Sequence, residues 1–82
     1  MKSILIIDDD QRLRNLLEEY LSEKKYNVYL ADDFLSAKEI LEYFFFDLVI
    51  LDRMMPSGDG INLINLIKEK KNTPVILLTA MG

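Results

Sequence analysis

Four short apolar runs alternate along the chain with longer segments of helical periodicity, and this alternation constrains the fold more than any other feature. The runs, rich in aliphatic and β-branched residues, cover residues 3–7, 27–31, 47–51 and 74–78. Short strands separated by helices pair in parallel through right-handed crossovers. The sequence therefore predicts an α/β fold with an open, doubly wound parallel sheet and the element order βαβαβαβ.

The segments between the runs carry apolar residues three or four positions apart, which is typical of helices with one buried face. We expect the buried faces to be formed by Leu13, Leu16, Leu17, Tyr20 and Leu21, then by Leu35, Ala37, Ile40, Leu41 and Phe44, and last by Ile61, Leu63, Ile64 and Ile67. Asp10 is placed to cap the first helix, and either Asp32 or Asp33 to cap the second.

Three runs, residues 4–7, 48–51 and 75–78, are continuously apolar and do not alternate with polar residues. Such runs are typical of strands in a parallel sheet that helices cover on both faces. Of the rings of Phe44, Phe45 and Phe46, we expect at least one in the core and one partly exposed.

Composition excludes several common chemistries. The first glycine is Gly58, so the turn after the first strand lacks the glycines of a dinucleotide fingerprint or a P-loop. The chain has no His and no Cys, which excludes the usual zinc sites and thiol or imidazole catalysis. A net charge of −4 argues against direct nucleic-acid contact by this segment. There is no run of membrane-spanning length and no signal peptide, so we expect a soluble, cytoplasmic protein without a membrane partner.

Carboxylates follow the first three predicted strands, and a hydroxyl follows the fourth. In chain order these residues are Asp8, Asp9 and Asp10, then Asp32 and Asp33, then Asp52, and last Thr79. Ligands of open α/β sheets bind beyond the carboxyl ends of the strands. If the first and third strands are neighbours, Asp8, Asp9 and Asp52 converge, and three carboxylates suit Mg²⁺. The alternative is a polar turn at residues 8–10 that only caps the helix.

Three motifs at these strand ends resemble the receiver domain of two-component response regulators. They are LIIDDD at residues 5–10, DLVILDRMMPSGDG at residues 47–60 and PVILLTAMG at residues 74–82. The resemblance covers all 82 residues and implies a flavodoxin-like fold. It also implies that Asp52 is the phosphoacceptor of a sensor histidine kinase and that Thr79 is the switch hydroxyl. Asp8, Asp9, Asp52 and the backbone carbonyl of Met54 would bind Mg²⁺.

The stretch at residues 53–56, RMMP, resembles receivers attached to winged-helix DNA-binding domains, which implies transcription control through an output domain outside this segment. Such a receiver is a phosphoacceptor and not an enzyme, beyond self-catalysed phosphoryl transfer and autodephosphorylation. Two other functions stay open. One is a Mg²⁺-dependent aspartyl phosphatase or phosphomutase of the haloacid dehalogenase type, although residues 8–12 do not match its DxDx[TV] motif. The other is a phosphorylation-independent interaction module.

Complete receivers have a fifth strand in the order 2-1-3-4-5, with a helix before it and another after it. The resemblance implies that residues 1–82 form a receiver that is incomplete at its C-terminus. It would lack the lysine and the aromatic residue of the fifth strand, and residues 74–78 would then lie at a sheet edge. Because this edge is apolar and uncharged, we expect a homodimer or an element-swapped oligomer.

Overall fold

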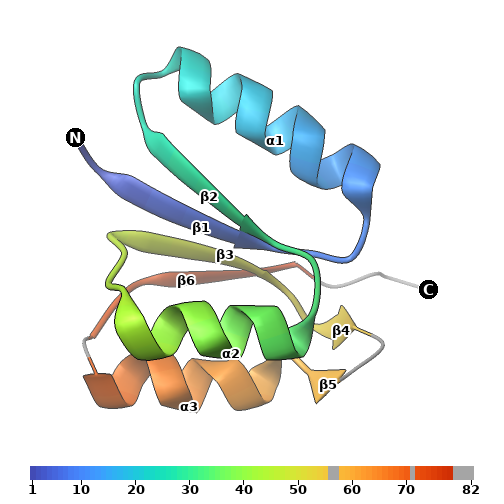
Figure 1. The fold of residues 1–82 in the computed structure, drawn as a ribbon, viewed down its shortest axis with the longest axis vertical. Coiled ribbons are helices and arrows are strands. Elements are labelled where there is room, and N and C mark those ends of the chain that lie inside the picture. The colour runs from blue at the N-terminus through green and yellow to red at the C-terminus, as the bar shows by residue number, and fades with distance from the viewer. Residues whose placement is uncertain (56–57, 71, 79–82) are drawn as a thin grey trace.

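The computed structural model describes residues 1–55, 58–70 and 72–78 as a three-layer α/β domain. Strands β1 (Ser3–Ile7), β2 (Asn27–Ala31), β3 (Leu48–Asp52) and β6 (Val75–Leu78) form a parallel sheet in the order β2-β1-β3-β6. Helix α1 (Gln11–Glu23) covers one face, and helices α2 (Phe34–Tyr43) and α3 (Ile61–Lys70) cover the other (Figure 1). The predicted doubly wound α/β fold is confirmed.

The strand bounds agree closely with the prediction. β1 and β2 are as predicted, whereas β3 is shifted by one residue and β6 begins at Val75. Pro74 lies just outside β6, although its carbonyl oxygen accepts the N–H of Val49 at 3.1 Å. The small antiparallel hairpin of β4 (Met54–Met55) and β5 (Gly58–Asp59) is not predicted by the sequence pattern. Strands of two residues are too short to show the alternation of apolar and polar residues by which a strand is recognised in a sequence.

Two apolar clusters fill the spaces between the layers. Toward α2 and α3 the sheet buries Leu5, Ile7, Ala31, Val49 and Leu51, which pack with Ala37, Leu41, Phe46, Met55, Leu63 and Ile67. Toward α1 it buries Ile4, Ile6 and Ile50, against which Leu17 and Leu21 pack. Successive residues of a strand point to opposite faces. A central strand covered on both sides therefore has to be apolar throughout, which explains the continuous runs of β1 and β3.

The predicted helix faces are only partly correct. Leu16 and Tyr20 of α1 are 65% and 57% exposed, and Leu35 and Phe44 beside α2 are 64% and 62% exposed. Ile61 is also exposed, at 37%. Each helix contacts the parallel sheet along a narrow line. Apolar residues at the margins of a predicted buried face therefore project into solvent. Among the described residues, no helix is long and apolar enough to cross a membrane.

Aspartates begin the first two helices. Asp10 caps α1, since its carboxylate accepts the N–H groups of Arg12 and Leu13, and Asp33 caps α2 by accepting the N–H of Ser36. Asp10 is therefore confirmed as a cap, and Asp33 is selected over Asp32.

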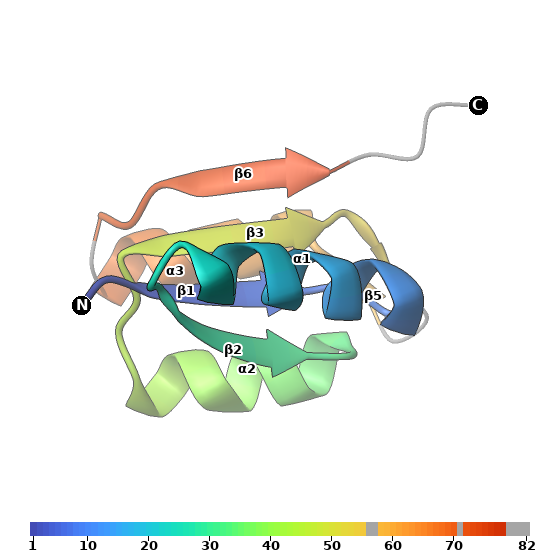
Figure 2. The same cartoon turned by 90° about the horizontal axis from the view of Figure 1, so that it is seen from above.

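β2 and β6 lie at the two edges of the described sheet, as Figure 2 shows from above. Helix α1 packs on β1 and β2, and β6 lies to one side of it. Ile76 of β6 is consequently 49% exposed. The prediction that residues 75–78 are covered on both faces is therefore wrong for the described part of the chain, since the helix that lies on this face does not reach as far as β6.

Candidate metal centre

Asp8, Asp9 and Asp52 lie together at the rim formed by the carboxyl ends of β1 and β3. These strands are adjacent, and Ile7 pairs with Leu51, so the residues that follow both reach the same rim. One carboxylate oxygen from each of the three aspartates lies within 4.8 Å of the others. The predicted convergence is confirmed.

The three carboxylates have different surroundings. Asp8 is only 3% exposed, and its Oδ1 accepts the N–H of Asp10 at 2.9 Å. Asp9 is exposed, and Asp52 is half-buried. Oδ1 of Asp52 accepts the N–H of Met54 at 3.3 Å. Asp8 thus belongs to the carboxylate cluster and also fixes the turn that leads to the cap Asp10. The two interpretations of residues 8–10, a metal site and a polar turn before a capped helix, are therefore compatible.

The surroundings of Asp52 raise its pKa. Burial raises the pKa of Asp52 above its ordinary value, and the negative charge of Asp8 raises it further. The N–H of Met54 opposes this by lowering the pKa, and Asp9 adds a smaller upward contribution through its charge and a hydrogen bond. A positive charge at the rim would remove the repulsion that these carboxylates exert on one another.

An open pocket of about 390 Å³ lies at this rim. It is lined by Asp8, Asp9, Asp10, Leu13, Asp52, Met54 and Leu78. Since one water takes about 30 Å³ of liquid, the pocket has room for a cation with several waters or for a phosphoryl group. The charged side chains that line the pocket are all carboxylates, and carboxylate oxygens are suitable ligands for a hard cation such as Mg²⁺. Met54, whose backbone carbonyl is the expected further metal ligand, is among the lining residues and is 65% exposed.

The segment after β3 is held against the rim by backbone contacts. The N–H of Gly60 donates to the carbonyl oxygen of Arg53 at 2.6 Å. A Cβ on residue 60 would lie 2.5 Å from the backbone oxygen of Asp52, so only glycine fits there without a shift of the backbone. Arg53 and Asp59 form a partly exposed ion pair at 3.5 Å, a weak contact by comparison.

Arg14 is a residue that the sequence analysis missed. Its Nη1 donates to the backbone oxygen of Asp8 at 2.7 Å, so a guanidinium on α1 stabilises the turn that presents Asp8 and Asp9. The feature of the sequence that could have identified Arg14 is its position one helical turn after the cap Asp10. Thr79, the predicted switch hydroxyl, and Pro56 lie outside the described residues.

Comparison with known proteins identifies the fold and the site as parts of one family. The profile of the response regulator receiver domain matches residues 4–82. The chain belongs to this family. It is 42% identical over 82 residues to the transcriptional regulatory protein CpxR of Escherichia coli K12, covering 100% of this chain and 35% of CpxR. It is 44% identical over 81 residues to the transcriptional regulatory protein ResD of Bacillus subtilis, covering 96% of this chain and 33% of ResD. The receiver thus spans about a third of the length of these relatives.

Solved receivers share its structure. The response regulator TrrA of Thermotoga maritima, determined in complex with Mg²⁺–BeF, superposes with a TM-score of 0.89 at 38% identity, covering 100% of this chain and 72% of TrrA. The non-phosphorylated HemR receiver domain of Leptospira biflexa superposes with a TM-score of 0.90 at 36% identity, covering 99% of this chain and 66% of that domain. The flavodoxin-like receiver fold is confirmed.

Proposed function

We propose that this receiver accepts a phosphoryl group on Asp52 from a sensor histidine kinase. The observation that carries the proposal is the convergence of Asp8, Asp9 and Asp52 at the open rim pocket. Of the three, Asp52 combines access to the pocket with a raised pKa and a fixed position at the end of β3. Its Oδ1 is held by the Met54 N–H, so we assign attack on phosphorus to Oδ2.

In the transfer step, a carboxylate oxygen of Asp52 forms a bond to phosphorus and gives a mixed anhydride. The bond between phosphorus and the donor's imidazole nitrogen breaks, and the nitrogen keeps the electron pair. Asp8, Asp9, Asp52 and the backbone carbonyl of Met54 are the groups that would hold Mg²⁺. When bound, this ion neutralises charge on the phosphoryl oxygens. The complex of TrrA with Mg²⁺–BeF supports this assignment.

Thr79 is assigned the switch hydroxyl that hydrogen-bonds the phosphoryl group, on the strength of the family resemblance. CpxR and ResD are transcriptional regulators, so we propose that phosphorylation controls an attached DNA-binding output domain in the cytoplasm. In this scheme the receiver is an acceptor with self-catalysed transfer and autodephosphorylation, and it makes no direct contact with DNA.

The test is to phosphorylate the intact protein with acetyl phosphate and Mg²⁺ and to map the acid-labile phosphate by mass spectrometry. We expect the label on Asp52, and Asp52→Asn should abolish it because an amide is a poor nucleophile. A label on Asp8 would instead support the haloacid dehalogenase-type phosphatase. An unlabelled protein, under conditions that phosphorylate TrrA, would support the interaction module.

A further inference from the structure

Within the described part of the chain, no strand pairs with the outer edge of β2. The N–H of Asn27 and the carbonyl oxygen of Ala31 bond to the backbone of the β1 segment at 2.9 and 3.1 Å. In a parallel ladder alternate residues bond to the same neighbour, so Tyr29 also bonds to β1. The N–H and C=O groups of Val28 and Leu30 therefore point away from the sheet.

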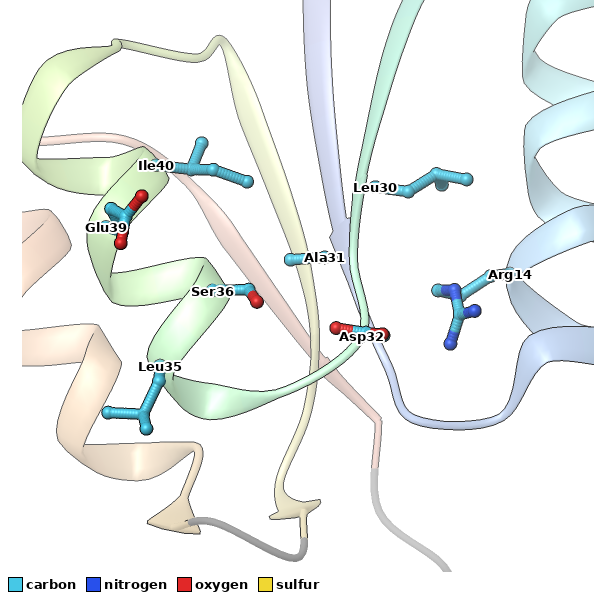
Figure 3. A pocket seen from close by; sticks show the side chains of 8 residues that line it. All are labelled: Arg14, Leu30, Ala31, Asp32, Leu35, Ser36, Glu39 and Ile40. Atoms are coloured by element: carbon cyan, nitrogen blue, oxygen red, sulfur yellow. The ribbon is translucent and has the colours of Figure 1, made fainter.

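Two neighbouring pockets lie along this edge. The first, of about 560 Å³, is lined by Arg14 of α1, by Leu30, Ala31 and Asp32 at the end of β2, and by Leu35, Ser36, Glu39 and Ile40 of α2 (Figure 3). The second, of about 220 Å³, is lined by Ser3, Tyr29, Leu30, Ile40, Phe44, Phe45 and Phe46. The two pockets share Leu30 and Ile40, so we treat them as one feature, the β2 groove.

The strand β2 itself lacks two of the features that keep natural edges from pairing, because its sequence NVYLA contains no charge and no proline. Beside it, the side chains of Tyr29, Phe44 and Phe45 are 50%, 62% and 63% exposed. The ring of Tyr29 packs edge-on against that of Phe46, with the ring centroids 5.5 Å apart. Exposed rings beside an unpaired strand offer apolar contacts to the side chains of a peptide that binds by strand addition.

A second copy of the chain does not fit this edge. Figures 1 and 2 together show that α2 lies in the helix layer opposite α1 and projects beyond β2. If two copies paired through β2 about a twofold axis, their strands would lie about 4.8 Å apart. Their α2 helices would then lie on the same face of the joined sheet and meet at the junction, whereas a single strand brings no second helix. The occupant is therefore a single extended strand.

The charged residues of the groove indicate which side chains a bound strand should carry. Asp32 and Glu39 place two carboxylates near the carboxyl end of β2, against the single positive charge of Arg14, one of whose N–H groups donates to the backbone of Asp8. At the other end the lining is apolar and aromatic. A complementary segment carries a lysine or arginine at one end and a bulky apolar side chain at the other.

We propose that the β2 groove binds an extended segment of a partner protein, which adds a strand to β2 through the backbone of Val28 and Leu30. β2 has five residues, and a strand rises about 3.3 Å per residue, so the segment spans roughly 16 Å. Its basic end lies at Asp32 and Glu39, and its apolar end lies at Phe44 and Phe45. The interaction uses none of the carboxylates of the rim.

The test is an NMR titration of the ¹⁵N-labelled protein with a capped seven-residue peptide of alternating valine and serine, with lysine at one end and phenylalanine at the other. The same peptide with the two end residues exchanged covers the opposite strand direction. We expect saturable shifts at the amides of Val28 and Leu30 with one of the two, and roughly tenfold slower hydrogen exchange there. Shifts confined to other parts of the chain would overturn the proposal. So would concentration-dependent pairing of these amides without peptide, because the occupant would then be a second copy.

Two N-methylated peptides test strand pairing with the protein unchanged. One blocks the peptide amides that face β2, and the other blocks the alternate amides that face solvent. Two lost backbone hydrogen bonds should weaken binding roughly tenfold or more for the first only. Equal binding of both would show that no strand is added.

Two matched variant pairs test the side-chain contacts. Phe45→Ala should weaken binding several-fold, whereas Leu16→Ala, which removes an equally exposed residue of α1, should not. Glu39→Gln should weaken binding of the lysine peptide but not of a peptide with glutamine in its place. Glu19→Gln on α1 is the charge control and should change neither. If each variant bound like its control, the assigned orientation of the segment would be wrong.

Discussion

Removing the charge of Asp52 should stabilise the metal-free protein. In the folded state a carboxylate oxygen of Asp52 lies within 4.8 Å of oxygens from Asp8 and Asp9, and unfolding separates Asp52 from the two aspartates that follow β1. Asp52→Asn abolishes this repulsion, while the amide oxygen can still accept the N–H of Met54. The substitution therefore favours the folded state, although it removes the proposed phosphoacceptor.

The size of the effect follows from the geometry. Two unit charges 4.8 Å apart repel by about 0.9 kcal/mol in water and by about 3.5 kcal/mol at an effective dielectric constant of 20. Asp9 is exposed, so its repulsion is near the lower value, whereas Asp8 is buried and its repulsion lies higher. We expect a gain in unfolding free energy of at least about 1 kcal/mol at pH 7. For a domain of this size that gain raises the Tm by about 4–8 °C.

The gain should depend on pH with a definite sign. Because the pKa of Asp52 is raised in the folded state, the folded chain binds more protons than the unfolded chain between the ordinary value of 3.8 and the raised pKa. The wild type therefore loses stability relative to the variant as the pH rises through this window. Below pH 3.8 the carboxyl is protonated in both states, and the difference disappears.

The assay is urea and thermal unfolding with a chelator present, from pH 3 to pH 8. The control is Asp32→Asn, which removes an exposed carboxylate after β2 that is not in the cluster and should change stability by less than about 0.5 kcal/mol. The reasoning is refuted if Asp52→Asn is neutral or destabilising at pH 7. It is equally refuted if the gain persists unchanged below pH 3.8.

Four further outcomes are expected. Saturating Mg²⁺ should stabilise the wild type by about 2.7 kcal/mol at a hundredfold excess over its Kd, and a thermal melt of Asp9→Asn should show a clearly smaller shift. Gly60→Ala should cost about 1–3 kcal/mol in urea unfolding because its Cβ meets backbone, whereas the Cβ of Gly58→Ala meets the side chain of Phe34, and this substitution should cost less. Asp10→Ala should lose about 1 kcal/mol of stability through the missing helix cap, measured by circular dichroism during thermal unfolding. The apolar edge at β6 should make the chain self-associate at micromolar concentration, and Ile76→Lys should restore a monomer in sedimentation.

The sheet and the carboxylate cluster were predictable because both depend on patterns within short stretches of sequence. A buried parallel strand needs an unbroken apolar run, and residues 4–7 and 48–51 meet that requirement. Once β1 and β3 are neighbours, the next residue of each strand has to reach the same rim. The position of Asp8 beside Asp52 therefore follows from strand order, without any knowledge of the loops.

Other features depend on three-dimensional distances that the sequence pattern does not contain. The periodicity of α1 includes Leu16 and Tyr20, but the line of contact with the sheet excludes them. The contact of Arg14 with the backbone of Asp8 depends on how closely α1 approaches the end of β1. The exposed rings of Phe44 and Phe45 show the same limitation, because their burial depends on where α2 ends relative to β2.

The carboxylate rim couples folding to cation binding. Asp8 and Asp9 follow β1, whereas Asp52 ends β3, so only the folded sheet brings the three charges together. Their repulsion is therefore a cost of folding in the absence of a cation, and the same repulsion is what a bound divalent cation removes. A cation that binds only the assembled rim must stabilise the fold, and a substitution that relieves the repulsion must weaken cation binding. Asp52→Asn should accordingly be more stable than the wild type without Mg²⁺, and its advantage should shrink or reverse as Mg²⁺ is added. An advantage that stays constant across the titration would show that the ion, if it binds, does not bind at these three residues.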